Sequence, residues 1–258
     1  MNKVSIIITN YNKEKYIKRA IRSCLNQTYK NLEVIIVDDN SNKELVSDIA
    51  RSFRPGAVRL IATSRNYGHY MCCNFAIDAA RGEYITFLGA DDRLERDHIR
   101  VLAAPLNKNK RLAASIGLYN RELEDGSPVG GTKLCEASIF FRKKSFVRDI
   151  GYFHPVRFAG DTEYRERAEK FYGKKAIIRI NKNTYKALYL KNSLTTTPST
   201  KGGSAARVSY VNSFRKNIKI NSGKKLRFDY KLQPLPFALH RDIAVKDFDI
   251  KTFSEIRL

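Results

Sequence analysis

Two adjacent aspartates, Asp91 and Asp92, follow an apolar run at residues 84–88. Neighbouring carboxylates repel each other, so they ionise together most easily when a cation lies beside them. A hard divalent ion that leaves positions open for phosphate oxygens suits such a pair. The spacing therefore indicates a Mn²⁺ or Mg²⁺ site. The alternative is that Asp92 caps a helix expected over residues 94–106.

The elements that must position these carboxylates alternate between strand and helix patterns. Polar clusters at residues 9–12, 38–41 and 89–92 each end a short apolar run. Alternating β and α patterns predict a mostly parallel sheet between two helix layers. Ligands of such sheets bind beyond the carboxyl ends of the strands, so we expect the three clusters to form one polar site. The expected strands are residues 4–9, 32–37, 58–62 and 84–88, and the expected helices are residues 43–53, 70–81 and 94–106 together with one that Asn12 caps.

Several other chemistries find no support in the sequence. No strand pattern is followed by a glycine-rich dinucleotide or P-loop motif. The four histidines are too scattered to predict a zinc site or a Ser-His-Asp triad. The four cysteines show no C-x-x-C spacing, and we expect buried, reduced thiols. With 43% hydrophobic residues and no apolar run near the ~20 residues of a membrane span, a folded cytosolic protein is expected.

The positive charge is concentrated in the last third of the chain. Of 48 Lys and Arg, 14 lie between residues 174 and 227, where no Asp or Glu occurs, and the whole chain has a formal charge of +22. Such a segment favours an anionic partner. Within it, Ser204 is placed to cap a helix that carries Val208, Val211, Phe214 and Ile218 near one face. That helix could bind an anionic membrane surface, or it could dock onto the protein's own body.

Five segments of the first 110 residues resemble the family 2 glycosyltransferases, which have the GT-A fold. They are residues 4–12, 23–28, 32–41, 66–68 and 80–88, with Asp91 and Asp92 after the last. The resemblance implies an α/β architecture with a Rossmann-like, mostly parallel central sheet. It also implies a nucleoside-diphosphate sugar donor, taken to be a UDP-sugar, and a divalent metal ion that binds its diphosphate.

The resemblance assigns donor-binding roles to individual residues. Thr9 and Tyr11 are similar to residues that line the base pocket, and Asp39 to the acceptor of the base's ring N–H. Asn66 is assigned to the donor site as well. Asp91 and Asp92 match the metal and diphosphate end of the family's aspartate motif.

Two positions depart from the family pattern. Gly89 stands where relatives often have an aspartate that contacts the ribose. Cys73 stands where many have Arg or Lys, so a phosphate contact would be missing or would come from the basic C-terminal segment.

The second half of the chain is similar to the family's acceptor half. There a Glu-Asp pair opens a helix, and its aspartate deprotonates the acceptor hydroxyl. This chain has Gly160 and Asp161 at that place, which makes Asp161 the candidate base and Glu163 its substitute. A base within hydrogen-bond reach of the hydroxyl is what inverting sugar transfer requires. Asp161 is also well placed to cap the helix expected over residues 162–172.

These inferences predict three regions and one activity. Residues 1–110 would form the nucleotide-sugar-binding half, residues 111–200 the acceptor-binding half, and residues 201–258 a basic C-terminal extension. The expected activity is inverting transfer of a sugar to a hydroxyl of a bacterial surface glycan or its lipid-linked precursor, with the enzyme in the cytoplasm or peripheral at the inner membrane face. The rival interpretations are a catalytically inactive binding module of the same fold and, with less support, a nucleic-acid-binding protein.

Overall fold

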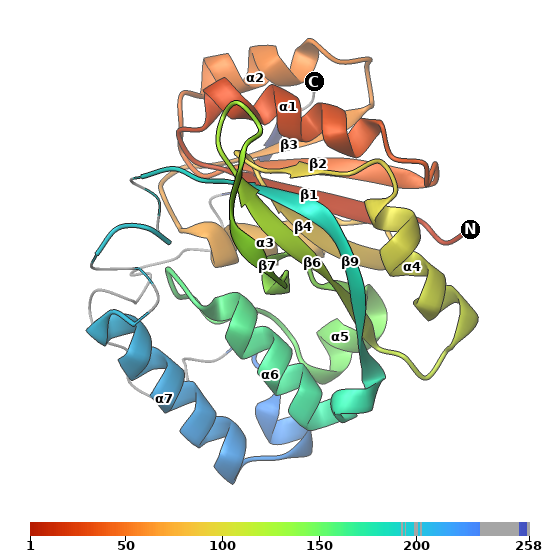
Figure 1. Ribbon diagram of the computed structural model, residues 1–258, viewed down its shortest axis with the longest axis vertical. Coiled ribbons are helices and arrows are strands. Elements are labelled where there is room, and N and C mark those ends of the chain that lie inside the picture. The colour runs from red at the N-terminus through yellow and green to blue at the C-terminus, as the bar shows by residue number, and fades with distance from the viewer. Residues whose placement is uncertain (192, 194, 199–200, 202, 233–252, 257–258) are drawn as a thin grey trace.

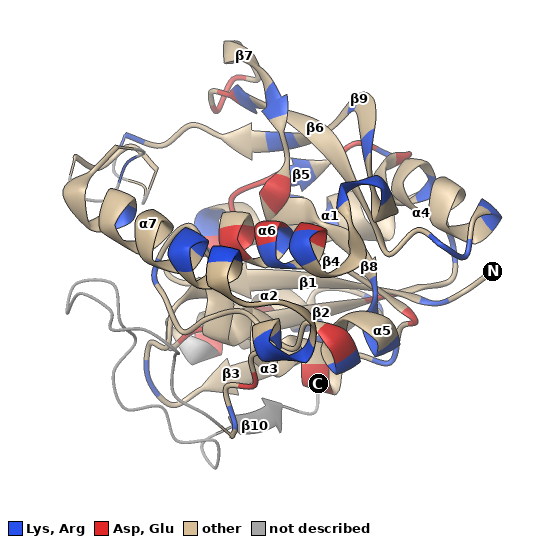
Figure 2. Cartoon of the chain, turned by 90° about the horizontal axis from the view of Figure 1, so that it is seen from below, with Lys and Arg blue, Asp and Glu red and all other residues tan. Residues whose placement is uncertain are grey.

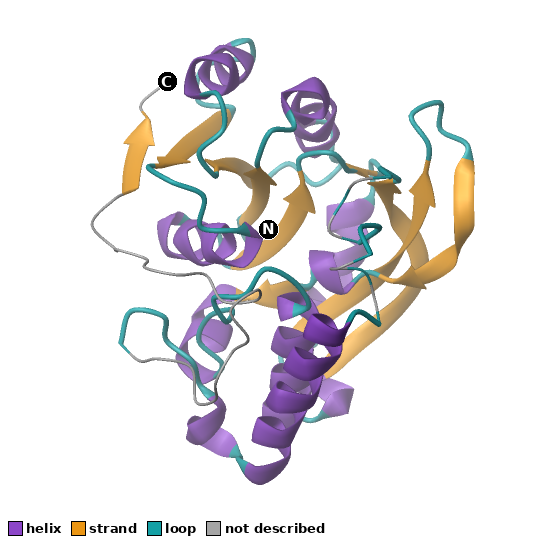
Figure 3. Cartoon of the chain, turned by 90° about the vertical axis from the view of Figure 1, so that its left-hand side faces the viewer, coloured by secondary structure: helices purple, strands orange, loops and turns teal. Residues whose placement is uncertain are grey.

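The computed structural model describes residues 1–191, 193, 195–198, 201, 203–232 and 253–256. A mixed α/β fold with one curled sheet runs through these residues (Figures 1 and 3). Its strands are β1 (Val4–Asn10), β2 (Leu32–Asp38), β3 (Val58–Thr63), β4 (Tyr84–Gly89), β5 (Arg93–Leu94), β6 (Ala114–Glu122), β7 (Pro128–Leu134), β8 (Phe140–Arg142), β9 (Ile177–Leu188) and β10 (Phe253–Ile256). Its α-helices are α1 (Glu14–Leu25), α2 (Lys43–Arg51), α3 (His69–Ala79), α4 (His98–Lys108), α5 (Lys143–Asp149), α6 (Gly160–Tyr172) and α7 (Ala205–Ile220).

The sheet places the carboxyl ends of its first strands at one edge. The order is β10-β3-β2-β1-β4-β8-β6-β9-β5, with β7 paired to β6. Strands β3, β2, β1 and β4 are parallel neighbours, as the alternating pattern predicted. Strand β2 pairs with one side of β1, and β3 lies beyond β2. Strand β4 pairs with the other side of β1, so the strand order reverses at β1. Ligands of open α/β sheets bind at such a reversal of strand order.

Both faces of the sheet are covered by helices, which is why its central strands are apolar throughout. Side chains alternate across a strand, so Ile7 contributes to one core cluster while Ile6 and Ile8 contribute to the other. Helices α1, α2 and α4 supply the second cluster, and α3, α5, α6 and α7 supply the first. All four cysteines are buried free thiols, as expected.

Two expected helix starts are wrong. Asn12 has a left-handed backbone (φ 51°) and caps nothing, because α1 begins at Glu14 behind Lys13. Asp92 is likewise no helix cap, since α4 begins at His98 and the strand β5 intervenes. The side chain of Asp92 is therefore available for another role.

The cationic helix α7 docks onto the body of the protein. Its Tyr210 and Phe214 are buried in the core shared with α6, whereas Val208, expected on the same face, is 45% exposed. The Ser204 side chain accepts a hydrogen bond from the Arg207 amide, which confirms the predicted cap. Figure 2 shows Lys and Arg on α7 beside a mixed-charge α6.

The segment beyond α7 also belongs to the core. Leu226, Phe228 and Tyr230 are buried, and the two aromatic residues belong to the same core cluster as α6 and α7. The described part of the chain contains no helix that is both long and apolar enough to cross a bilayer.

Candidate active site

A cavity of about 670 Å³ opens beyond the carboxyl ends of β1, β2 and β4. The three polar clusters predicted to meet do meet here, since each contributes to the cavity wall. Its lining includes the expected site residues Thr9, Tyr11, Asp39, Asn66, Asp91, Asp92 and Asp161. Glu163 is the one candidate that does not line it.

Asp39 follows the end of β2 and is held by backbone donors. Its Oδ1 accepts from the Tyr67 amide at 2.6 Å, and its Oδ2 accepts from the Gly68 amide at 2.8 Å. Burial raises the pKa of Asp39, and these hydrogen bonds oppose that rise. Gly68 has φ 85°, a conformation that favours glycine and lets the loop before α3 turn its amide toward the carboxylate.

Asp91 presents a carboxylate to the cavity. Lys13 Nζ lies 3.2 Å from its Oδ2, and Arg19 donates to its backbone carbonyl at 2.8 Å. Lys13 precedes α1 and Arg19 lies within it, so the first helix positions the loop after β4. The cation of Lys13 offsets the charge of Asp91.

Asp92 is held differently from its neighbour. Its Oδ2 accepts from the Tyr185 hydroxyl, and its Oδ1 accepts from the Leu188 amide at 2.9 Å. Burial, together with the charge of Asp91, raises the pKa of Asp92 to about 7. Asp92 thus joins the loop after β4 to β9 through both of its carboxylate oxygens.

Gly89 explains how two carboxylates fit at this turn. A Cβ at position 89 would lie 2.9 Å from Asp92 Oδ2 and 3.2 Å from Asp91 Oδ1. The space of a side chain at position 89 is therefore filled by the two carboxylates.

The carboxylates of the cavity suit a metal ion that binds together with a diphosphate, rather than a metal ion held by protein ligands alone. No group of three or more His, Cys, Asp or Glu in the described part of the chain could enclose an ion. Mg²⁺ commonly uses one or two carboxylates, substrate phosphates and water. Asp91 is the carboxylate in the cavity that could serve in this way, because both oxygens of Asp92 already accept protein hydrogen bonds.

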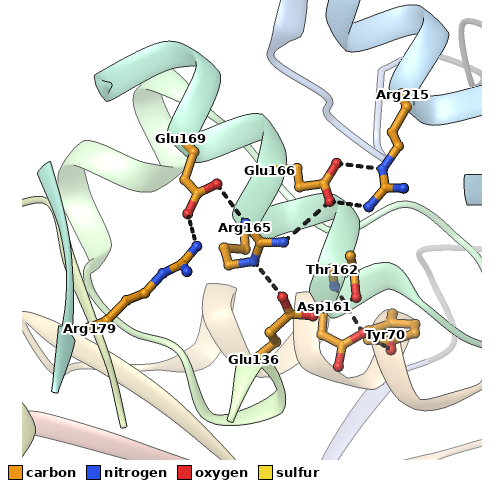
Figure 4. A network of polar contacts seen from close by, with 9 residues as sticks. All are labelled: Tyr70, Glu136, Asp161, Thr162, Arg165, Glu166, Glu169, Arg179 and Arg215. Carbon is orange, nitrogen blue, oxygen red and sulfur yellow. Dashed lines mark hydrogen bonds and ion pairs between the residues drawn. The ribbon is translucent and has the colours of Figure 1, made fainter. Parts of the chain in front are cut away.

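Asp161 lies in the first turn of α6 and faces the cavity (Figure 4). Its Oδ1 accepts from the Tyr70 hydroxyl and from the Thr162 amide, each at 2.9 Å. Asp161 is not the cap that was expected, because α6 begins at Gly160 behind Ala159, which has φ 59°.

Glu163, the substitute candidate base, is a structural residue. It is 1% exposed, and Arg167 binds it through two hydrogen bonds of 2.7 and 2.9 Å. The guanidinium of Arg167 also donates to the carbonyls of Ile150 and Tyr152. The burial of Glu163 keeps its carboxylate away from the hydroxyl of any acceptor substrate.

A second network holds the first turns of α6 against the cavity wall (Figure 4). Glu136 accepts from the Thr162 hydroxyl at 2.6 Å and from Arg165 Nε at 2.5 Å. Arg165 also donates to Glu169 at 2.6 Å. Glu136 lines the cavity and fixes the residue next to Asp161, so it sets the direction of the helix end.

Sequence reasoning missed two cavity residues, His69 and Arg207, and a residue behind the cavity wall, Tyr70. His69 Nδ1 lies 2.7 Å from Thr9 Oγ1, and burial lowers the pKa of His69 to about 4, which keeps its ring neutral. Tyr70 reaches Asp161, and Arg207 enters the cavity from α7. The segment at residues 66–68 was the available signal for His69 and Tyr70, while nothing local pointed to Arg207.

A family model described as "Glycosyl transferase family 2" matches residues 5–187. The chain belongs to glycosyltransferase family 2. Among curated relatives of this family 2 protein, it is 28% identical over 194 residues to a GalNAc(5)-diNAcBac-PP-undecaprenol beta-1,3-glucosyltransferase of Campylobacter jejuni, covering 74% of this chain and 62% of that one. It is 38% identical over 148 residues to the putative glycosyltransferase EpsH of Bacillus subtilis, covering 57% and 42%.

Solved structures show the same fold. Residues 1–349 of S. aureus TarS, in complex with UDP-GlcNAc, match with a TM-score of 0.64 at 19% identity, covering 84% of this chain and 66% of that chain. The likeness confirms the expected GT-A type architecture. The family 2 chain spans 39%, 48% and 62% of the lengths of the first three curated relatives that it matches.

Proposed function

We propose that this family 2 chain transfers a sugar, with inversion, from a nucleoside-diphosphate donor to a hydroxyl of a bacterial surface glycan or its lipid-linked precursor. The carrying observation is that three carboxylates line one cavity: Asp39 after β2, Asp91 after β4 and Asp161 in the first turn of α6. UDP is the proposed nucleotide. Support for it comes from the TarS structure in complex with UDP-GlcNAc, whose fold this chain shares.

Each carboxylate has a distinct proposed role. Asp39, with Thr9 and Tyr11, holds the base of the donor. Asp91 binds a divalent ion that would offset the charge of the departing diphosphate. Asp161 accepts the proton of the acceptor hydroxyl, because it is a carboxylate that lines the cavity and is aligned by Tyr70.

Binding and turnover of candidate donors test this function. Thermal unfolding with Mn²⁺ and a panel of nucleotide sugars should show a rise in Tm for a UDP-sugar, since a ligand that binds only the folded state stabilises it. Asp91→Ala should abolish the metal-dependent part of that rise. Tight binding of a donor without hydrolysis or transfer to any acceptor would instead identify an inactive binding module.

The base assignment has its own test. Asp161→Asn should lower kcat by about 10²–10⁴-fold while leaving donor affinity unchanged, because general base catalysis contributes that much. Glu166→Gln is the control, since Glu166 lies on the same helix, outside the cavity lining, and pairs with Arg215. Transfer at the normal rate by Asp161→Asn would show that Asp161 only stabilises α6.

A further inference from the structure

One wall of the cavity is a face of the paired strands β6 and β9, which run side by side in Figure 1. Tyr119 and Arg121 lie two residues apart on β6, so their side chains point to the same face. Both line the cavity. Tyr185 and Ala187, which pair with them on β9, line it as well. These four residues form the β6–β9 wall.

The β6–β9 wall is bonded to the loop after β4. The Tyr185 hydroxyl donates to Asp92 Oδ2, and the Leu188 amide donates to Asp92 Oδ1 at 2.9 Å. Ala187, the residue before Leu188, is the cross-strand neighbour of Arg121. Neighbouring strands lie about 4.8 Å apart. The backbone of Arg121 is therefore about one strand spacing from the segment that holds Asp92.

Arg121 is a half-buried cation without an acidic partner. It makes no hydrogen bond or ion pair with any residue in the described part of the chain. Its cross-strand neighbours, Val129 on β7 and Ala187 on β9, are apolar. The acids closest in sequence and in the loop after β4 are paired with other cations: Glu122 with Arg93 at 2.7 Å, Glu124 with Lys15 at 2.8 Å and Asp91 with Lys13 at 3.2 Å. The charge of Arg121 is thus left for a ligand.

The contact that Arg121 does make leaves its hydrogen-bond donors available. Its guanidinium lies 5.9 Å from the centre of the Tyr189 ring. The Tyr189 amide donates to the Glu122 carbonyl at 2.8 Å, which fixes the ring's backbone beside β6. Arginine packed on an aromatic ring keeps its planar fork of N–H groups for the oxygens of a phosphate or carboxylate. The wall therefore offers a ready donor set to an oxyanion.

We propose that Arg121 binds the diphosphate of the donor. This rests on the proposed function, in which Asp91 and a divalent ion bind the same diphosphate. The donor is the source of the anion because the β6–β9 wall is bonded to the loop that carries Asp91. Arg121 then supplies the phosphate contact that Cys73 cannot make, since Cys73 is 1% exposed and lies outside the cavity lining.

Arg121 also has a role in the transfer step. The acceptor oxygen bonds to the anomeric carbon of the sugar, and its proton goes to Asp161. The bond from that carbon to the phosphate oxygen breaks, and its electron pair stays on the departing diphosphate. A fixed cation at the diphosphate stabilises the charge that develops there.

Calorimetric titration of the full chain with UDP and with uridine, both in Mg²⁺, tests the assignment. The two ligands share base and ribose, so the difference between their affinities reports on the diphosphate. Arg121→Ala should weaken UDP binding at least about tenfold with uridine affinity unchanged, because a hydrogen bond to a charged group contributes that much. Arg121→Lys keeps the charge without the planar fork, and its affinity for UDP should lie between those of Arg121→Ala and the wild type.

Lys133→Ala is the matched control. Lys133 is an exposed cation on β7, paired with Tyr119 and outside the cavity lining. This variant should bind UDP like the wild type. Thermal unfolding shows whether each variant is folded, and Arg121→Lys keeps the test valid if Arg121→Ala is not.

Three results would overturn the proposal. The first is equal UDP affinity for the Arg121 variants and the wild type. The second is an equal loss of UDP and uridine affinity, which would show that Arg121 only maintains the shape of the cavity. The third is unchanged UDP binding with weaker binding of glycerol 3-phosphate to the UDP-saturated chain, which would assign Arg121 to the acceptor. A wild type that binds no nucleoside diphosphate would contradict the proposed function itself.

Discussion

Tyr70 fills the space that a side chain at position 160 would need. A Cβ on Gly160 would lie 2.8 Å from the Tyr70 ring, and that ring stacks on Phe153 with centroids 5.5 Å apart. Gly160 is therefore matched to the tyrosine, whose hydroxyl donates a hydrogen bond to Asp161.

Removing the Tyr70 hydroxyl should slow transfer more than it weakens binding. Tyr70→Phe takes away one of two hydrogen bonds to Asp161 Oδ1, and a hydrogen bond to a charged group contributes about 1.5–3 kcal/mol. We expect kcat to fall at least about tenfold with KM for the donor unchanged. Tyr172→Phe is the matched control, because the Tyr172 hydroxyl bonds the carboxylate of Asp149, which lies outside the cavity lining. Equal kcat for both variants would contradict the positioning role.

A side chain at position 89 should disturb Asp92 rather than restore a ribose contact. Gly89→Ala would place a Cβ 2.9 Å from a carboxylate oxygen that Tyr185 already holds. Overpacking of this kind costs about 1–3 kcal/mol of unfolding free energy. Urea denaturation should show that loss for Gly89→Ala and none beyond experimental error for Gly131→Ala, whose Cβ would meet nothing within 4 Å.

At the scale of elements, α6 joins the cavity to the C-terminal part of the chain. Asp161 lies in the first turn of the helix at the cavity, and nearly two turns later Arg167 is buried with Glu163. Arg167 Nη1 lies 3.4 Å from the Leu226 carbonyl, beyond α7. The C-terminal segment is thus one of the supports that fix the helix end carrying the proposed base.

Breaking the buried pair should cost far more than breaking a surface pair of the same helix. Arg167→Met leaves the carboxylate of Glu163 buried without its partner, which costs about 3–5 kcal/mol. Arg215→Met removes a partner of Glu166 that is 55% exposed, and such pairs contribute about 0–1 kcal/mol. Chemical denaturation compares the two variants. A similar loss for both would show that the buried network is not what anchors α6.

For the molecule as a whole, buried histidines make stability depend on pH. His98 is 1% exposed, its ring nitrogens contact Thr184 and Ser138, and burial lowers its pKa to about 4. In the unfolded chain His98 binds a proton as the pH falls below about 6.5, whereas in the folded chain its ring stays neutral down to about pH 4. The contribution of His98 to the free energy of unfolding is therefore complete above pH 6.5 and is lost as the pH falls toward 4. Asp92, with its raised pKa, acts in the opposite sense over the same range.

The free energy of unfolding should fall between pH 7 and pH 5, because burial lowers the pKa of His69, His98 and His154, and these three histidines together outweigh Asp92. One histidine shifted in this way contributes about 2 kcal/mol to that fall. His98→Gln, which can keep hydrogen bonds to the two hydroxyls, should remove most of that share in urea denaturation at the two pH values. An unchanged difference between pH 7 and pH 5 in the variant would show that His98 does not titrate as a buried group.

The sequence by itself determined the strands and the polar ends that follow them. Apolar runs such as residues 32–37 need burial on both faces, and alternation with amphipathic helices leaves few topologies other than a parallel sheet. The convergence of Asp39 and Asp91 follows from that topology. Helix starts were less well determined. Asn12, for example, is a residue type that often caps helices, but its backbone has the left-handed conformation of a turn.

Only the tertiary structure decided which carboxylates are available to a ligand. Asp92 and Glu163 look equivalent to Asp91 and Asp161 in the sequence, yet β9 holds one and Arg167 holds the other. The position of Arg207 near Tyr70 likewise depends on how α7 packs against the rest of the protein. These contacts join residues far apart in the chain, and local propensity has no information about them, because they depend on how whole elements pack.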